Sequence, residues 1–160
     1  MSTVAIFLAV VVTGFALLLT GSGLLFRSAR REGEHGPLLQ AFAVVAAGLA
    51  ALMYAWGMLF VAGAVVSAEG GGTDSAPLRP CRSLGQEVAF HTVGYDVDYV
   101  PLRFVCVTSD GGHHPADAVP GYVNPALAVL GLTAAGLGAW AAVESERRAR
   151  RVHASGDPAR

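Results

Sequence analysis

Three long apolar runs dominate the pattern of hydrophobic and polar positions along the chain. The first, Val4 to Phe26, contains no charged residue. At ~1.5 Å per residue of helix, it is long enough to cross a hydrocarbon core of about 30 Å. The second extends from Leu38 to Ala68, with Gln40 as its only strongly polar residue before Ser67, and the third extends from Ala126 to Val143. The pattern predicts three membrane-spanning helices.

The flanks of the runs refine this prediction. Basic residues follow the first run instead of preceding it, which argues against a cleaved signal peptide. The second run opens at Pro37 and is longer than a bilayer requires. Either that helix tilts, or its last turns project into the aqueous space, where the glycines at 70–72 would end it. Asn124 and Pro125 precede the third run, and they predict a helix start with Asn124 as the N-cap.

The distribution of arginine predicts the direction of insertion. Three arginines lie in the link 27–36 and five in the tail 144–160, whereas the long loop 69–122 contains three. Basic residues near the ends of spans resist translocation, so the link and the tail are expected in the cytoplasm. The N-terminus and the long loop are expected outside. The predicted segments are helix 1 (1–26), the link (27–36), helix 2 (37–68), the loop (69–122), helix 3 (123–143) and the tail (144–160).

Composition supports a membrane protein and excludes several other classes. The chain of 160 residues is 53% hydrophobic and 14% charged, which is too apolar for an ordinary soluble domain. The net charge is -1, so no basic field favours a nucleic-acid partner. Lysine is absent, which excludes Schiff-base chemistry and a phosphate-binding loop, although the codon usage of a high-GC genome explains that absence equally well.

The long loop contains the only two cysteines, Cys81 and Cys106. An oxidising compartment favours a disulfide between them, which should destabilise the unfolded loop by ~3 kcal/mol. A metal site would usually include further cysteines, and a thiol redox enzyme would usually have a C-x-x-C spacing. The pair is therefore interpreted as a structural disulfide.

The loop between these cysteines has the composition of strands. The segments 87–93 and 95–107 are rich in β-branched and aromatic residues and predict an antiparallel pair, with Gly94 as a turn or bulge position. Asp96 and Asp98 alternate with apolar residues and are expected on the solvated face. Proline cannot donate to a ladder, so Pro101 predicts an edge strand or a break between two short strands. The segment 69–77 has linker composition, so the folded part is expected to begin near Leu78.

The polar end of the loop holds the candidate metal ligands. His113 and His114 follow a turn at Asp110, Gly111 and Gly112, so His113, His114 and Asp110 could bind a metal. Adjacent side chains in extended backbone point apart, however, which favours ordinary surface histidines in a polar loop. His91 is expected to be a packed or hydrogen-bonded structural residue. Ser109, Asp110 and His113 are too close in sequence for a catalytic triad, and no nucleophile elbow surrounds the serine.

The apolar runs contain no Asp, Glu, Lys, Arg or His, which disfavours transport by this chain alone. Tyr54 and Trp56 either pack between helices or mark the outer interface.

Rows of small residues at every fourth position favour close helix packing, although an alanine-rich genome produces the same pattern. These rows are Ala43, Ala47, Ala51 and Ala55 in the second run, and Gly131, Ala135 and Ala139 in the third.

The basic segment 146–153 can extend the third helix into the cytoplasm, where its arginines would rest on anionic lipid or on an acidic protein. The simpler interpretation is that these arginines determine the orientation of the chain.

Three motifs resemble small multi-span integral membrane proteins of high-GC actinobacteria that have no assigned activity. The motifs are VPLRFVC at 100–106, DGG at 110–112 and VPGYVNP at 119–125, and the likeness covers the C-terminal half of the chain. The resemblance implies a class and a location, and it implies no substrate.

The expected fold is all-α and transmembrane, with three helices and a small disulfide-stapled, β-containing extracytoplasmic loop. The expected function is non-enzymatic: an accessory or structural subunit without a cofactor, embedded in the lipid bilayer, whose outer loop contacts a membrane protein or a second copy. One alternative is an outer-face enzyme or metal-handling protein that uses His91, His113, His114 and neighbouring acids. Another is a transporter or channel component that acts as an oligomer.

Overall fold

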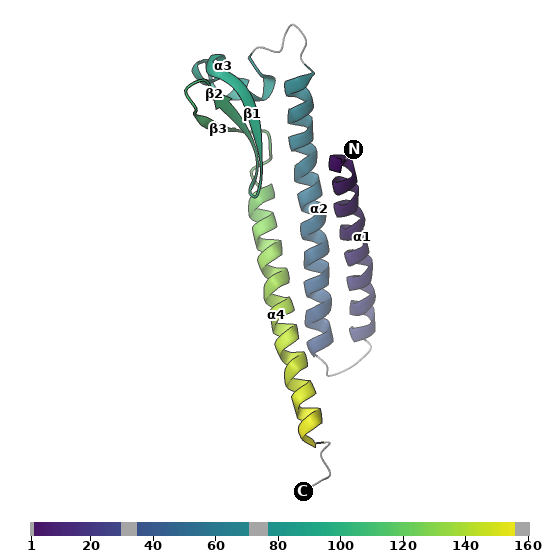
Figure 1. Ribbon diagram of the computed structural model, residues 1–160. Helices are drawn as coiled ribbons and strands as arrows, with labels where there is room; N and C mark the ends of the chain where they lie inside the picture. The colour runs from purple at the N-terminus through teal and green to yellow at the C-terminus, as the bar shows by residue number, and fades with distance from the viewer. Residues whose placement is uncertain (1, 30–34, 71–76, 156–160) are drawn as a thin grey trace. The chain divides into compact units, whose positions relative to one another are not determined.

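The computed structural model describes residues 2–29, 35–70 and 77–155, and three long apolar helices make up most of it (Figure 1). Helix α1 spans Ser2–Ala29, α2 spans His35–Glu69 and α4 spans Val123–Ser155. Each helix contains a stretch that is long and apolar enough, by length and composition, to cross a membrane. The three long helices that the apolar runs predict are therefore present.

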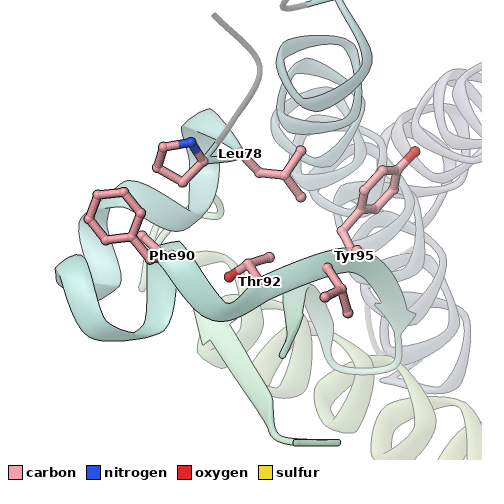
Figure 2. A pocket seen from close by; sticks show the side chains of 8 residues that line it. Leu78, Phe90, Thr92 and Tyr95 are labelled. Carbon is pink, nitrogen blue, oxygen red and sulfur yellow. The ribbon is translucent and has the colours of Figure 1, made fainter. Parts of the chain in front are cut away.

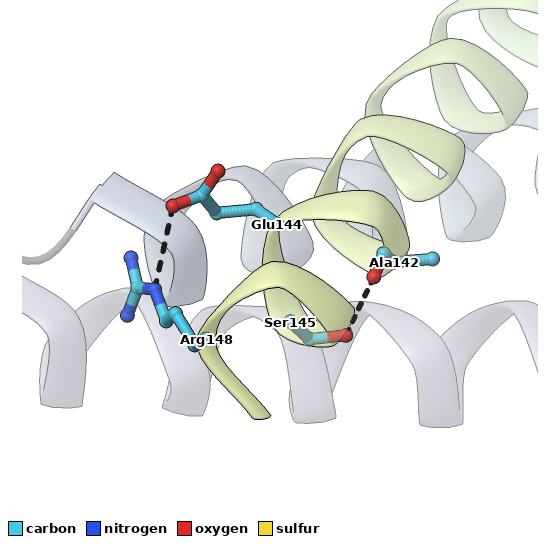
Figure 3. A network of polar contacts seen from close by, with 4 residues as sticks. All are labelled: Ala142, Glu144, Ser145 and Arg148. Atoms are coloured by element: carbon cyan, nitrogen blue, oxygen red, sulfur yellow. Dashed lines mark hydrogen bonds and ion pairs between the residues drawn. The ribbon is translucent and has the colours of Figure 1, made fainter. Parts of the chain in front are cut away.

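Helix α4 continues well beyond the third apolar run, through most of the predicted tail. The side chain of Arg148 forms an ion pair with Glu144 four residues earlier, with 3.5 Å between Nε and Oε1 (Figure 3). Arg150 and Glu146 form a second, longer pair of the same spacing. Exposed pairs of this kind contribute only about 0.3–0.5 kcal/mol each to helix stability. They add slightly to the stability of this part of α4, and the arginines stay at the surface.

Glycine allows α1 and α2 to approach closely. A Cβ atom at Gly21 would lie 2.7 Å from Cγ2 of Val45, and one at Gly48 would lie 3.0 Å from the carbonyl oxygen of Gly14. Both distances are shorter than real side chains tolerate without a shift in the neighbouring helix. The contact between these two helices therefore depends on glycine at these positions.

The two predicted rows of small residues differ in their surroundings. In α2, Ala43 and Ala55 are buried, and Ala51 lies against Gly14 of α1. In α4, by contrast, Gly131, Ala135 and Ala139 are all exposed. Within the described residues, the α2 row is a packing face, and the α4 row is not.

The chain divides into two compact units, of which residues Met53–Ala126 form one, called the sheet module below. Besides the second half of α2, the module contains a 3-10 helix, a short α-helix and three antiparallel strands in the order β1-β2-β3. Their bounds are η2 Arg79–Leu84, α3 Gln86–His91, β1 Thr92–Tyr99, β2 Leu102–Thr108 and β3 His113–Ala116.

The strand prediction for 87–93 is wrong over most of its length, because residues up to His91 form α3. Gly85, with φ of +94°, separates η2 from α3 in a backbone conformation that few other residues adopt. Gln, Glu and Ala in QEVAFH favour a helix, and Glu87 in the first turn complements the helix dipole. The predicted bulge at Gly94 is confirmed by a shift in the β1–β2 register between Thr92 and Gly94.

Pro101 separates β1 from β2, so the predicted break between two short strands is confirmed. The two strands pair with each other from Thr92↔Thr108 to Tyr99↔Leu102. Asp96 and Asp98 are exposed, as expected for the solvated face of β1. The third strand, β3, was not expected, and it places His113 and His114 in a sheet instead of a loop.

The core of the module lies between the sheet and the last turns of α2. Phe104 is fully buried and stacks on Tyr95, with 5.1 Å between ring centroids. Ala64 and Ala68 of α2 belong to the same buried cluster. The hydroxyl of Tyr95 donates a hydrogen bond to Glu69 at the end of α2, which raises the pKa of Tyr95. The excess length of the second apolar run therefore has a structural use, because its last turns complete a folded core.

Candidate functional site in the sheet module

The two cysteines form the predicted disulfide. Cys81 of η2 and Cys106 of β2 are both fully buried, and their Cα atoms are 6.0 Å apart. The bond joins residues separated by 25 positions and ties the 3-10 helix η2 to the central strand of the sheet. The disulfide thereby holds η2 against the core around Phe104.

Asn124 clamps the hairpin to the start of α4. Its Oδ1 accepts a hydrogen bond of 3.0 Å from the backbone N–H of Leu102, and its Nδ2 donates one of 3.0 Å to the carbonyl oxygen of the same residue. The side-chain amide therefore satisfies both backbone groups of the first residue of β2, as a neighbouring strand would.

This geometry corrects the prediction that Asn124 is an N-cap. Helix α4 begins at Val123, and its first turn closes with a hydrogen bond from the N–H of Ala126 to the carbonyl of Tyr122. Tyr122 therefore occupies the capping position, and Asn124 lies inside the first turn. The bonding partner of Asn124 is 22 residues away, so local helix signals could not identify it.

A close approach at Gly57 brings α2, β2 and α4 together. A Cβ atom there would lie 2.8 Å from Cγ1 of Val123 and 3.1 Å from Cδ1 of Leu102. Val123 and Leu102 are both almost fully buried. Gly57 therefore leaves the space that these two side chains fill.

Tyr54 and Trp56, the two aromatic residues singled out in the second apolar run, both reach partners within the module. The hydroxyl of Tyr54 donates a hydrogen bond of 3.4 Å to the backbone carbonyl of Tyr99, at the end of β1. The indole N–H of Trp56 donates one of 3.1 Å to the hydroxyl of Tyr122. Trp56 also packs edge-to-face on Phe60. Polar tips on apolar rings thus fasten the hairpin and the start of α4 to α2.

Asn124→Ala is expected to destabilise the module by about 2 kcal/mol, because it leaves the buried N–H and C=O of Leu102 without partners. Amide hydrogen exchange in β2 should accelerate by about 30-fold, measured by mass spectrometry in detergent. Asn124→Asp keeps the acceptor and loses the donor, so an intermediate rate is expected for it. If the β2 amides of the Asn124→Ala variant exchange at the wild-type rate, this role of Asn124 is contradicted.

An apolar hollow of about 430 Å³ opens at the surface of the module (Figure 2). Phe90 and Val93 border it and are 71% and 70% exposed. The full lining comprises Pro77, Leu78, Ala89, Phe90, Thr92, Val93, Gly94 and Tyr95. The sequence could not predict this hollow, because the hollow forms where α3 turns into β1, and the segment 87–93 was predicted to be a continuous strand.

His91 and His114, but not His113, line a second hollow of about 450 Å³. Its full lining comprises Glu87, Val88, His91, Thr108, Asp110 and His114. Nδ1 of His91 donates a 2.7 Å hydrogen bond to the carbonyl of Glu87, so His91 is hydrogen-bonded, as expected. On β3, His113 is exposed and His114 is half-buried. Neighbouring positions of a strand face opposite sides, as the sequence predicted for this pair. Over residues 4–28, 36–70 and 77–151, whose side chains the structure describes, no three His, Cys, Asp or Glu residues form a group that could hold a metal.

Asp110 closes the turn between β2 and β3. Its Oδ1 accepts hydrogen bonds from the hydroxyl of Thr108 and from the N–H of Gly112, and these bonds lower its pKa. Gly111 adopts a φ of +81° in the same turn. A lowered pKa means that ionised Asp110 stabilises the turn above its unfolded pKa, and that this stabilisation is lost as the pH falls through the folded value.

Replacement of both His113 and His114 by alanine is expected to leave Zn²⁺ binding by the full chain unchanged, because the two imidazoles leave β3 on opposite faces. Isothermal titration of the purified protein in detergent measures this. Stoichiometric binding by the wild type that disappears in the double variant would contradict the expectation and would favour a metal site.

The described residues combine long helices of membrane-type composition with a small sheet that is fixed by one disulfide and by the two hydrogen bonds of Asn124. Comparison with protein-family models, with curated proteins and with solved structures finds no match for this chain.

Proposed function

We propose that this chain is a three-span integral membrane protein whose sheet module lies outside the cytoplasm and acts as a non-enzymatic interaction element. The observation that carries the proposal is the solvent-open hollow beside Phe90 and Val93, where two large apolar side chains are left mostly exposed. Exposed apolar surface of this kind marks sites of protein contact.

Two independent features support the outer location of the module. Its disulfide suits an oxidising compartment, where such bonds form and persist. The arginines of the link 27–36 and of the C-terminal segment favour the cytoplasm for both segments. With three spans, these two placements agree, since the module then lies across the membrane from the basic segments.

The module is suited to binding because it is held in one shape. The Cys81–Cys106 bond ties η2, close in sequence to Pro77 and Leu78 of the hollow, to the sheet, and the two hydrogen bonds of Asn124 fix the far end of the hairpin. A rigid surface loses less conformational freedom on binding than a flexible loop does. The proposed partner is another membrane protein or a second copy of this chain, with this chain as an accessory or structural subunit.

A reporter enzyme that is active only outside the cytoplasm tests the topology. Fused after Arg160, it is expected to be inactive, because the arginines of α4 keep the C-terminus inside. Fused after Ala118, before α4, it is expected to be active. The reverse pattern would overturn the proposed orientation and, with it, the outer location of the module.

The hollow itself is tested in native membranes with a photoreactive amino acid at position 90. A discrete cross-linked species is expected, and the partner it identifies should copurify with the wild type in mild detergent and be lost from Phe90→Asp. The matched control places the same photoreactive residue at Asp96, which is also exposed but lies outside the hollow. Equal cross-linking at both positions, or copurification that survives Phe90→Asp, would contradict the proposal.

A further inference from the structure

The tip of the hairpin between β1 and β2 is an exposed apolar projection. Val100 is 90% exposed, and Tyr99 and Pro101 beside it are exposed as well. The first charged residues away from the tip are Asp98 and Arg103, which are register partners on neighbouring strands. The hairpin therefore ends in three apolar residues, Tyr99 to Pro101. The rung next to them, which is the cross-strand pair of Asp98 and Arg103, has one acidic and one basic side chain.

The tip is attached to defined positions on two helices. Tyr99 accepts its hydrogen bond from Tyr54 of α2, and Leu102, directly after the tip, is clamped by Asn124 of α4. Leu102 also lies against Gly57 of α2. The height of the tip is thus tied to residues 54–57 of α2 and 122–124 of α4.

These positions lie about one bilayer thickness from the charged flank of each helix, although the apolar run of α2 continues to Ala68. From Pro37, which follows the charged link, to Trp56 is about 20 residues, or ~30 Å of helix. From Glu144, the first charge after the third run, back to Tyr122 is about 22 residues, or ~33 Å. Both lengths match a hydrocarbon core of about 30 Å. The two counts are independent, and they end at two residues that are hydrogen-bonded to each other.

Trp and Tyr are the residues that concentrate at the boundary between lipid and water. Trp56 and Tyr122 are both partly exposed, and each carries a polar atom that is already hydrogen-bonded. The pair has the character of an interfacial belt, and the tip of the hairpin is held at the same level through Tyr54.

We propose that the tip Tyr99–Pro101 inserts into the outer lipid leaflet, so that the sheet module binds the membrane surface directly. Val100 contacts the upper acyl chains, and the rung of Asp98 and Arg103 meets the headgroups. At ~3.3 Å per residue, that rung lies about 7 Å from Val100, which limits the depth of insertion to the interface. The inference rests on the proposed membrane location of the module.

The experiment uses the full chain in vesicles of phosphatidylcholine and phosphatidylglycerol, with a fluorescent amino acid at position 100. The control carries the same label at Val93, which is 70% exposed at the other end of β1. Because Val100 is almost wholly exposed, the label does not disturb the core. A nitroxide at the top of the lipid acyl chain is expected to quench position 100 at least threefold more than position 93, and aqueous iodide is expected to show the opposite order.

A third label, at the exposed Leu132 in the middle of α4, separates the two proposals. If a mid-chain nitroxide fails to quench position 132, the membrane location itself fails. If position 132 is quenched and iodide reaches position 100 as readily as position 93, the tip lies in water, and the insertion alone is overturned. Shielding of position 100 from both quenchers would show that protein covers the tip, and it would likewise overturn insertion into lipid.

Discussion

Phe104→Ala is expected to lower the free energy of unfolding of the sheet module by about 3–5 kcal/mol, the usual cost of removing a large buried aromatic side chain. Phe104 is fully buried at the centre of the cluster that joins the sheet to α2, and its ring stacks on Tyr95. The alanine variant loses the apolar contact of the ring and leaves a cavity that the disulfide-linked segments cannot fill by collapsing. Hydrogen exchange of the β2 amides measures the effect.

The matched control is Phe90→Ala, which removes the same side chain from an exposed position in the same module. Its effect is expected to stay within about 0.5 kcal/mol, as for most surface substitutions. Similar exchange rates in the two variants would contradict the assignment of the core to the region around Phe104.

Replacement of both Cys81 and Cys106 by alanine is expected to destabilise the module by ~3 kcal/mol, because the unfolded loop of 25 residues regains its conformational freedom. Exchange of the β2 amides should accelerate by about 100-fold. The double variant is preferred to either single one, because a single substitution leaves a free thiol that can form unwanted cross-links.

Reduction of the wild-type protein should reproduce the change seen in the double variant, and the double variant should not respond to the reductant. Protection of β2 that is the same with and without the disulfide would show that the bond adds nothing to the stability of the module.

The long helices could be predicted because their signal is a sum over many residues. Runs of about 18 or more mostly apolar residues differ from the patterns of soluble helices and strands, whatever their neighbours are. Short segments give no such signal. The hydrophobic pattern of QEVAFH fits a strand or a helix, since six residues are too few for periodicity to decide between them, and its helix propensity alone is a weak signal. Here Gly85 and the start of β1 at Thr92 delimit a helix.

The strand β3 illustrates a second limit. His113–Ala116 includes Pro115 and has little strand propensity of its own. It is extended because it pairs with β2 along the register Val107↔His113 to Phe104↔Ala116. Pairing partners of a strand are tertiary information, so the sequence assigned this segment to a loop.

By itself, the sequence determined the three apolar helices and the pairing of the two cysteines, because these follow from composition and from counting along the chain. Only the tertiary structure decided that the last turns of α2 complete the core around Phe104, and that Asn124 clamps Leu102 instead of capping α4. The physical reason is that each of these roles is a contact between residues far apart in the chain, and no local pattern records which distant surface a side chain will meet.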